Sequence, residues 1–253
     1  MRAVRYHGPK QPLQMEDVPK PSPGPGEVVV KVTAAGLCHT ELHFLSGLLN
    51  LGVAPLTLGH EVVGWGESTG PGVSAPQPGD RVIVYGVGTV AFGLTQLAKL
   101  SGAEVIAISR TPAKLDKARA LGAAHAINVN DGGVAERVRE ITGGHGADVI
   151  FDLVATKETM AVSTAVLAKR GRLIFIGYSE DSFTVHPIQL VITEASVGGS
   201  VGNTLHELVR AIDLVARGKI VTVVDRTLPL DEFQKGLDAL ARGELVGRAV
   251  LRP

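Results

Sequence analysis

The sequence has few aromatic residues, a single cysteine and no excess of charge of either sign. Phe, Trp and Tyr together make up 4% of the 253 residues, and the one cysteine is Cys38. A lone cysteine excludes a disulfide within the chain and a zinc knot built from four thiolates. The 25 basic residues are matched by 25 acidic residues. The chain therefore has no excess of positive charge that would favour binding to nucleic acid.

Long apolar runs are missing as well. No segment approaches the roughly 20 consecutive apolar residues of a transmembrane helix, and the opening MRAVRYHGPKQ has no apolar signal core. We therefore expect a cytoplasmic protein with no membrane partner. What the sequence does contain is an apolar fraction of 45% and 31 glycines. That composition suits tightly packed layers of helices and strands.

The chain changes character near residue 82. Residues 1–81 contain short β-branched runs separated by Pro/Gly connectors such as PKPSPGPGE, which predict a small barrel or sandwich. Strand-like and helix-like segments then alternate. The expected strands are 81–86, 104–109, 124–129, 147–153, 171–177 and 194–201, and the expected helices are 89–102, 111–122, 133–143, 157–169 and 204–219. This alternation predicts an α/β fold with a doubly wound parallel sheet.

A glycine-rich turn follows the first strand of this alternation. In VIVYGVGTVA, Gly86 permits a tight turn, Gly88 leaves room for a pyrophosphate, and Ala91 lets the next helix pack closely on the sheet. The helix begins at Thr89 and Val90, where free N–H groups and the helix dipole favour phosphate. The pattern predicts dinucleotide binding, although an isolated triplet also fits an ordinary Gly-rich turn.

The end of the next strand distinguishes between two dinucleotides. NAD sites commonly place a carboxylate there to accept the ribose hydroxyls, but this chain has Ser109, followed by Arg110 and, one helical turn later, Lys114. A hydroxyl and two cations suit a 2′-phosphate, which a carboxylate would repel. We therefore favour NADP, with NAD as the alternative. Alternatively, Arg110 and Lys114 are ordinary surface charges at the start of a helix.

Two short motifs in the first part carry ligands that zinc prefers. GLCHTELH contains Cys38, and LGHEVVG contains His60 and Glu61. By themselves these residues do not establish a zinc site, because each also fits an ordinary structural role. A sole cysteine also fits a buried small hydrophobe, a single histidine also fits a surface position, and two separated ligands fall short of a complete zinc shell.

The order of motifs resembles the zinc-type medium-chain alcohol dehydrogenases. GLCHTELH, GHE, GDRV, GVGTVAFG and GRAVL follow one another as in that family, and the resemblance covers essentially the whole chain. It implies a GroES-like catalytic domain (1–81 and 226–253), here truncated, and a Rossmann domain (82–225). It also implies a catalytic zinc on Cys38 and His60, which Glu61 can approach.

The same resemblance implies roles for further residues. Thr40 corresponds to the hydroxyl that hydrogen-bonds the substrate alcohol, and His43 to the end of a proton relay. Glu41 takes the place of a carboxylate that orients the zinc histidine. Arg248, in GRAVL, matches a position that supports coenzyme binding.

The nicotinamide and its partners follow from the implied fold. The nicotinamide is expected near Val154 and Gly177, beyond the carboxyl ends of the parallel strands. The implied partners are a small alcohol or aldehyde substrate and a second copy of the chain. A homodimer or homotetramer would form through the sheet edge near residues 194–201.

The resemblance also implies that an internal segment is lacking between Arg81 and Gly86. In the family a long stretch separates GDRV from GVGTVAFG and carries the third zinc ligand and a lobe with four cysteines. Here the two motifs overlap on VIVYG. The overlap favours a deletion over a natural compact variant or an incomplete sequence. We expect the shared strand, residues 81–86, to belong to the Rossmann sheet because Gly86 must lie at its carboxyl end.

The predicted function is hydride transfer between an alcohol or aldehyde (or ketone) and a nicotinamide coenzyme, assisted by zinc. One alternative is a zinc-free reductase of the same superfamily, such as a quinone reductase. The other, from a different class, is a dinucleotide-binding module without turnover, because the zinc ligand set is incomplete.

Overall fold

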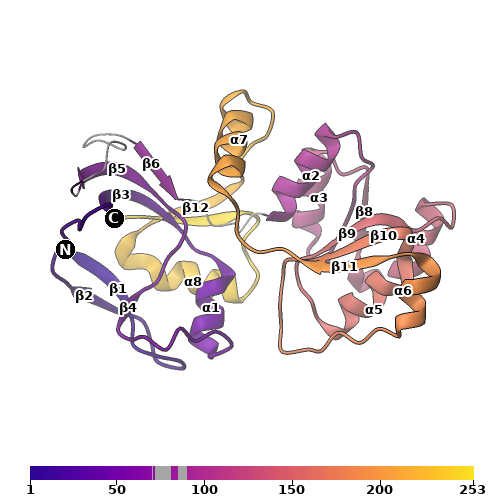
Figure 1. The fold of residues 1–253 in the computed structure, drawn as a ribbon, viewed down its shortest axis with the longest axis horizontal. Coiled ribbons are helices and arrows are strands. Elements are labelled where there is room, and N and C mark those ends of the chain that lie inside the picture. The colour runs from indigo at the N-terminus through magenta and orange to yellow at the C-terminus, as the bar shows by residue number, and fades with distance from the viewer. Residues whose placement is uncertain (70, 72–80, 85–89) are drawn as a thin grey trace. The chain divides into compact units, whose positions relative to one another are not determined.

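The structure is a computed structural model that describes residues 1–69, 71, 81–84 and 90–253 (Figure 1). The chain divides into two compact units. The first unit comprises Met1–Val90 and Thr222–Pro253, and the second comprises Ala91–Val221. This division falls at 90/91 and 221/222, whereas the sequence analysis expected 81/82 and 225/226. Each unit is described by itself below.

The first unit is built on a sheet with the order β12-β13-β3-β5-β6. Its strands are β3 (Val28–Gly36), β5 (Val62–Thr69), β6 (Arg81–Val84), β12 (Val224–Pro229) and β13 (Arg248–Arg252). β12 and β13 are parallel, and the other neighbours are antiparallel. Pairing of β13 with β3 places the C-terminal strand beside residues that lead directly into GLCHTELH.

A smaller sheet and two helices complete the first unit. The sheet has the order β2-β1-β4, with β1 (Arg2–Tyr6), β2 (Gln14–Asp17) and β4 (Leu56–Thr57), and the helices are α1 (His39–Ser46) and α8 (Phe233–Ala241). Leu37, Leu237 and Ala249 belong to one buried apolar cluster. Gly236 on α8 permits this packing, because a Cβ at that position would lie 2.5 Å from Cδ1 of Leu37. The core therefore fixes the backbone immediately before Cys38.

The second unit contains two parallel sheets and six helices among its described residues. One sheet pairs β7 (Ile106–Ser109) with β8 (His125–Asn128), and the other has the order β11-β10-β9, with β9 (Ala147–Asp152), β10 (Leu167–Phe175) and β11 (Ser196–Gly199). The helices are α2 (Val90–Leu100), α3 (Pro112–Leu121), α4 (Val134–Ile141), α5 (Lys157–Val166), α6 (Pro187–Thr193) and α7 (Leu205–Ala216). Val90, the first residue of α2, is counted with the first unit. Strands and helices alternate as the sequence predicted.

The two parallel sheets correspond to a doubly wound sheet without its first strand. In such a sheet the first strand lies between the second and the fourth. Here β7 and β8 occupy the second and third places and β9 the fourth, and no strand of the described chain pairs with both β7 and β9. Apolar side chains on these strands are consequently accessible: Ile108 is 45% exposed and Phe151 40%.

The strand expected at that central place lies elsewhere. Arg81–Val84 forms β6 and pairs antiparallel with β5, from Val62↔Val84 to Trp65↔Arg81. The expectation that this strand belongs to the Rossmann sheet is therefore wrong for residues 81–84. The physical reason is locality, because consecutive antiparallel strands close over a short connection, whereas insertion between two parallel strands requires distant partners.

Local signals were read correctly in α3. Thr111 is the N-cap residue, Pro112 occupies the first turn, and Gly122 ends the helix in the left-handed conformation with φ 112°. Pro at the start and Gly just past the end are the positions that helix geometry favours for these residues. No helix of the described residues is both long enough and apolar enough to cross a bilayer.

Candidate active site

Cys38 caps the first helix of the first unit. Its backbone is extended (φ −105°, ψ 160°), and α1 begins at the next residue. The Cys38 N–H donates to Oε2 of Glu41 at 2.6 Å, so the buried carboxylate satisfies an N–H that the helix leaves free. The cap determines where the thiol lies.

Glu41 also holds His60. Its second oxygen, Oε1, lies 3.2 Å from Nδ1 of His60. Because Nδ1 is engaged by the carboxylate, Nε2 remains the ring atom that can meet a metal or the thiol of Cys38. The role that the sequence analysis gave to Glu41 therefore has a matching geometry.

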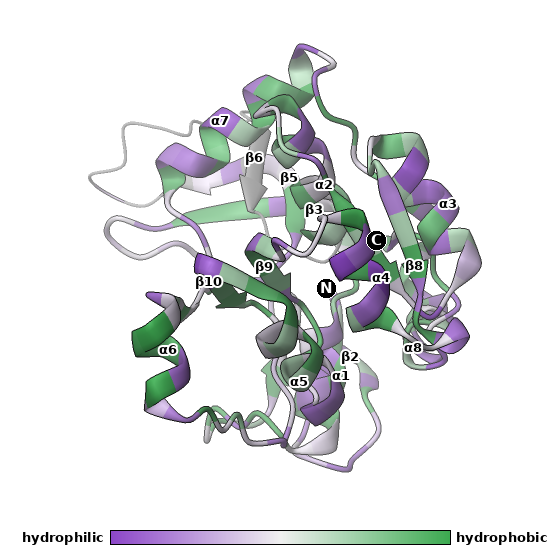
Figure 2. Ribbon diagram, turned by 90° about the vertical axis from the view of Figure 1, so that its right-hand side faces the viewer, coloured by the Kyte–Doolittle hydropathy of each residue, from purple (hydrophilic) through white to green (hydrophobic). Residues whose placement is uncertain are grey.

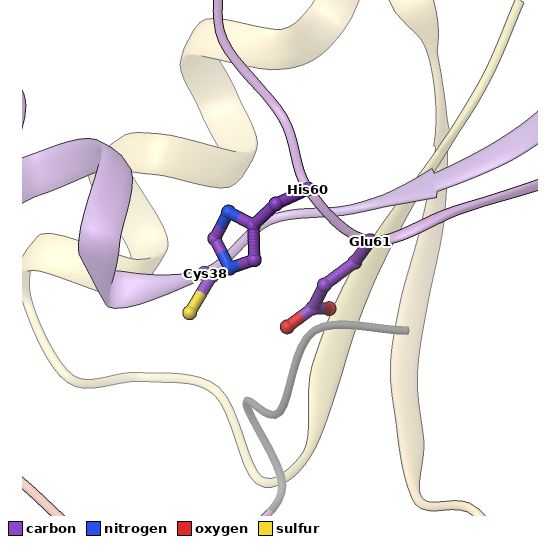
Figure 3. Close-up of side chains that lie close together, drawn as sticks. All are labelled: Cys38, His60 and Glu61. Atoms are coloured by element: carbon purple, nitrogen blue, oxygen red, sulfur yellow. The ribbon is translucent and has the colours of Figure 1, made fainter. Parts of the chain in front are cut away.

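Three possible metal ligands meet at this point (Figure 3). One ligand atom each from Cys38, His60 and Glu61 lie within 4.8 Å of one another. Thiolate, imidazole and carboxylate are all zinc ligands, and three protein ligands with one open position characterise catalytic zinc. The donor chemistry fits zinc, although the ligand atoms must approach one another slightly to share one ion.

The thiol and the imidazole alter each other's protonation. Burial opposes ionisation of Cys38, but hydrogen bonds from His60 and Thr40 and the charge of Arg248 outweigh it and lower the pKa of the thiol. The hydrogen bond with Cys38, followed by that with Glu41, raises the pKa of His60. The pair is therefore biased towards thiolate and imidazolium. The thiolate is the form that binds metal, whereas His60 must release its Nε2 proton before that nitrogen can bind one.

Glu61 is held by a buried arginine. Nη2 of Arg248 donates to Oε1 of Glu61 at 2.6 Å, and Nη1 donates to the carbonyl of Leu37 at 2.7 Å. Burial raises the pKa of Glu61, and the charge of Arg248 opposes this rise. The sequence analysis assigned Arg248 to the coenzyme, and that role stays a prediction. Its contacts within the first unit are with the residues next to Cys38 and His60.

Thr40 and His43 lie on α1 beside the cluster. The Thr40 hydroxyl is 3.5 Å from Sγ of Cys38. His43 follows three residues later, so both side chains belong to neighbouring positions on the helix surface. The His43 ring lies 5.6 Å from that of His39, and burial lowers the pKa of His43. A hydroxyl thus lies beside the Cys38 thiol, and a neutral imidazole lies one turn further along α1.

The residues expected to select the coenzyme lie at the end of β7. Ser109 is its last residue, and the Ser109 hydroxyl accepts a hydrogen bond from the Thr111 N–H at 3.3 Å. The Arg110 carbonyl accepts one from Nδ2 of Asn130 at 3.1 Å, which anchors the backbone after the strand. Lys114 lies on the first turn of α3.

Val154 and Gly177 follow the adjacent strands β9 and β10. The Val154 N–H donates to Oδ1 of the buried Asp152 at 3.0 Å, and the Gly177 N–H donates to the Asp152 carbonyl at 3.1 Å. A Cβ on Gly177 would lie 2.1 Å from the Leu153 carbonyl, so only glycine fits. The structure therefore brings these two loops together.

Three of the predicted coenzyme residues, Gly86, Gly88 and Thr89, lie outside the described residues, and Val90 opens α2.

Comparison with known families assigns the chain to one of them. The profile of the family described as "Zinc-binding dehydrogenase" matches residues 74–217, more than half of the chain. The chain belongs to the zinc-binding dehydrogenase family. The resemblance drawn from GLCHTELH and GHE is thereby confirmed at the family level.

Related dehydrogenases align along the full chain. It is 25% identical to an NAD-dependent alcohol dehydrogenase of Sulfurisphaera tokodaii, with 100% of each sequence covered. It is 24% identical to an alcohol dehydrogenase of Geobacillus stearothermophilus, covering 100% of this chain and 99% of the relative. The structure superimposes on the crystal structure of the alcohol dehydrogenase of Aeropyrum pernix with a TM-score of 0.90, 26% identity and full coverage of both chains.

This dehydrogenase is shorter than its relatives. The alignment with the Sulfurisphaera tokodaii protein runs over 350 positions, whereas the chain has 253 residues. At least 97 aligned positions, the difference between these numbers, therefore have no residue in this chain. Both sequences are covered completely, so these positions fall inside the alignment rather than at its ends. That they form one missing segment, as the motif overlap predicts, and that it lies between Arg81 and Gly86, stays a prediction.

Sequence reasoning missed the contacts that organise this dehydrogenase site. It did not foresee the bridge from Arg248 to Glu61 and Leu37, which joins residues 187 and 211 positions apart. It also missed Asp152 as the anchor of the loop that carries Val154. Asp152 follows a strand-like apolar run in ADVIFDL, and a polar residue ending such a run was the available signal.

Proposed function

We propose that this zinc-binding dehydrogenase catalyses hydride transfer between an alcohol or aldehyde and a nicotinamide dinucleotide, with zinc held by Cys38, His60 and Glu61. The observation that carries the proposal is the meeting of these three ligand atoms within 4.8 Å. Glu61 takes the place of the ligand that the missing segment carries in the family. The relatives named as alcohol dehydrogenases support the same reaction class.

The chain's own residues organise the reaction around these groups. When bound, zinc supplies a Lewis acid for the substrate oxygen and the nicotinamide supplies or accepts the hydride. Glu41 keeps the His60 ring oriented through Nδ1, so that Nε2 faces the ligand position. The Thr40 hydroxyl, 3.5 Å from Sγ of Cys38, is placed to hydrogen-bond the substrate oxygen.

His43 is the proposed proton acceptor. It lies one helical turn beyond Thr40, and burial keeps its pKa low, so the imidazole is neutral at pH 7. A neutral ring can take the proton that the Thr40 hydroxyl passes on when an alcohol is oxidised. The reverse transfer serves aldehyde reduction.

NADP is the proposed coenzyme. The last residue of β7 is Ser109 rather than a carboxylate, and Arg110 and Lys114 follow it. The 2′-phosphate gains charge-assisted hydrogen bonds from these cations. The proposed position of the nicotinamide is beside the Val154 and Gly177 loops.

The proposed assembly is a homodimer through the outer edge of β11, with a homotetramer as the larger alternative. Among the described strands, β11 pairs with β10 on one side and has no neighbour on the other. The preceding helix, α6, carries exposed apolar residues, among them Val191 (73%) and Ile192 (66%), and its hydropathy colouring is visible in Figure 2. Pairing of two β11 strands would satisfy the free edge and cover these side chains.

Zinc analysis and coenzyme titration test the catalytic proposal. Purified protein should contain close to one zinc per chain, bind NADPH more tightly than NADH and oxidise members of an alcohol panel. C38S should lose zinc and activity but keep coenzyme binding, because Cys38 belongs to the first unit and Ser109 to the second.

The alternatives give different outcomes in the same experiment. Activity on quinones without zinc would indicate the zinc-free reductase. Coenzyme binding without zinc or turnover would indicate the dinucleotide-binding module.

Light scattering tests the proposed dimer, and the double variant V191K/I192K should shift the protein to monomer.

A further inference from the structure

Arg248 connects the two segments that carry the candidate ligands. Its buried guanidinium donates to the Leu37 carbonyl at 2.7 Å and to Oε1 of Glu61 at 2.6 Å. Leu37 immediately precedes Cys38, and Glu61 immediately follows His60. The Arg248 side chain therefore links the backbone just before Cys38 to the side chain just after His60.

Backbone hydrogen bonds reinforce this connection. The Leu37 N–H donates to the Ala249 carbonyl at 3.0 Å, next to Arg248, and the Gly36 N–H donates to the Glu61 carbonyl at 2.7 Å. These bonds fix the backbones of both segments. They do not fix the direction of the Glu61 carboxylate, which depends on its side-chain contacts.

The Glu61 carboxylate is held through Oε1, and its Oε2 lies in space that Gly36 leaves open. Oε1 is engaged by Arg248, and Oε2 lies where a Cβ on Gly36 would approach it to 2.2 Å. Gly36 leaves room for this orientation of the carboxylate, and a larger residue there would make the end of the Glu61 side chain shift. The hydrogen bond from the buried Arg248 therefore favours this orientation of the carboxylate, beside Cys38 and His60.

We propose that Arg248 is a positioning residue that makes Glu61 the third metal ligand of this shortened dehydrogenase. The inference rests on the metal site of the proposed function. Arg248 neutralises and orients the Glu61 carboxylate through Oε1 and holds the Cys38 segment through the Leu37 carbonyl. The ligand lost with the missing segment is thereby replaced by a residue that the rest of the chain already holds in place.

A guanidinium can hydrogen-bond the Glu61 carboxylate and the Leu37 carbonyl at the same time, which the ammonium of a lysine would do less well. Two N–H groups of a planar fork reach two acceptors on different segments, while the charge compensates the buried carboxylate. A lysine at position 248 would supply the charge as a point and could not serve both acceptors well. R248K should therefore retain part of the effect, and R248Q, which lacks the charge, should retain less.

Metal affinity tests the inference without relying on activity. Zinc competition with a chromophoric chelator is measured on the wild type, R248K, R248Q and E61Q, with R252Q as the matched control on the same strand, β13. We expect R248Q to weaken zinc binding about 10- to 100-fold, the range for residues that orient ligands. R252Q should bind as the wild type does, and R248K should lie between them.

A double variant separates positioning from a general loss of stability. If Arg248 acts through Glu61, R248Q/E61Q should bind zinc no more weakly than E61Q alone, because the effects are not additive within one interaction. The double variant also removes the unpaired buried carboxylate that could unfold R248Q. The visible spectrum of bound Co²⁺ should change in R248Q and E61Q alike, while circular dichroism verifies folding.

The outcomes separate this inference from the proposed function. Wild-type protein that binds no zinc overturns the metal site, and the inference with it. If the wild type binds zinc and R248Q binds it with the same affinity and the same cobalt spectrum, the metal site stands but the positioning role of Arg248 is overturned. Additive losses in the double variant do the same, because they assign Arg248 a role independent of Glu61.

Discussion

Gln96 and Val221 are 125 positions apart and are joined by a pair of hydrogen bonds. The Val221 N–H donates to Oε1 of Gln96 at 2.8 Å, and Nε2 of Gln96 donates to the Val221 carbonyl at 3.1 Å. The amide side chain thus pairs with the main chain as a neighbouring strand would. The contact ties α2, the first helix of the second unit, to the last residue of that unit.

Q96L should destabilise the second unit by about 1–3 kcal/mol, because it leaves polar main-chain groups of Val221 without their partner. Urea unfolding measures the change. Q234L is the matched control, since Gln234 is exposed and its side chain donates to Asp238 within its own helix. It should change stability by less than ~0.5 kcal/mol. Equal stabilities of the two variants would contradict the structural role of Gln96.

E41Q should weaken zinc binding about 10-fold or more, because Glu41 orients His60 through Nδ1. E207Q is a close control. Glu207 occupies the same third position of a helix, α7, and accepts the Thr204 N–H at 2.7 Å. Both variants lose a charged helix cap, so a comparable fall in zinc affinity in both would refute the special role of Glu41.

Coenzyme preference should respond to Arg110 and Lys114. R110A and K114A are expected to weaken NADPH binding about 10-fold each while changing NADH binding less than about 2-fold, since only NADPH carries the 2′-phosphate. S109D should reverse the preference by repelling that phosphate. K117A, one turn further along α3, serves as control. Fluorescence titration gives the dissociation constants. Equal losses for both coenzymes would argue against NADP selection here.

His43 should titrate below its ordinary pKa of about 6.5, because burial disfavours the imidazolium. The sign follows directly. The ring is neutral at pH 7 and remains able to accept a proton until the pH falls through its lowered pKa. Histidine NMR of the wild type, with H43Q to assign the resonance, measures the value. A titration midpoint at or above 6.5 would contradict the prediction.

Hydrogen exchange should distinguish β10 from β7 and β9. β10 has a neighbour on each side, whereas β7 pairs only with β8, and β9 only with β10, among the described strands. About half the amides of β7 and β9 point to the unpaired side and should exchange rapidly, since protection follows hydrogen bonding. Leu173, fully buried on β10, should be among the slowest. Uniform protection of the three strands would mean that another strand covers the free edges.

Local sequence signals located much of the second unit. Thr111, Pro112 and Gly122 defined the ends of α3 because capping depends on residues adjacent in the chain. The helix Pro187–Thr193 was not anticipated. It spans barely two turns, too short for its apolar periodicity to stand out. The strand ending in Phe175 begins at Leu167, inside the segment that helical propensity suggested, because pairing with β9 overrides local preference.

The candidate site was predicted in its residues but not in its connections. Cys38, His60 and Glu61 were selected from two short motifs, and the structure brings them together. The charge that holds Glu61 comes from Arg248, near the other end of the chain. No spacing rule connects such distant positions, so their contact depends on the pairing of β13 with β3.

The sequence by itself determined the family, the alternation of strands and helices, the ligand types of the candidate metal site and the absence of a carboxylate after β7. These properties reside in residue identity and in neighbours along the chain. Only the tertiary structure decided that residues 81–84 join β5, that the described parallel strands form two separate sheets, and that Arg248 bridges Glu61 and Leu37. Each of these depends on competition between distant partners, because a strand or a charge settles where hydrogen bonding and burial together are most favourable.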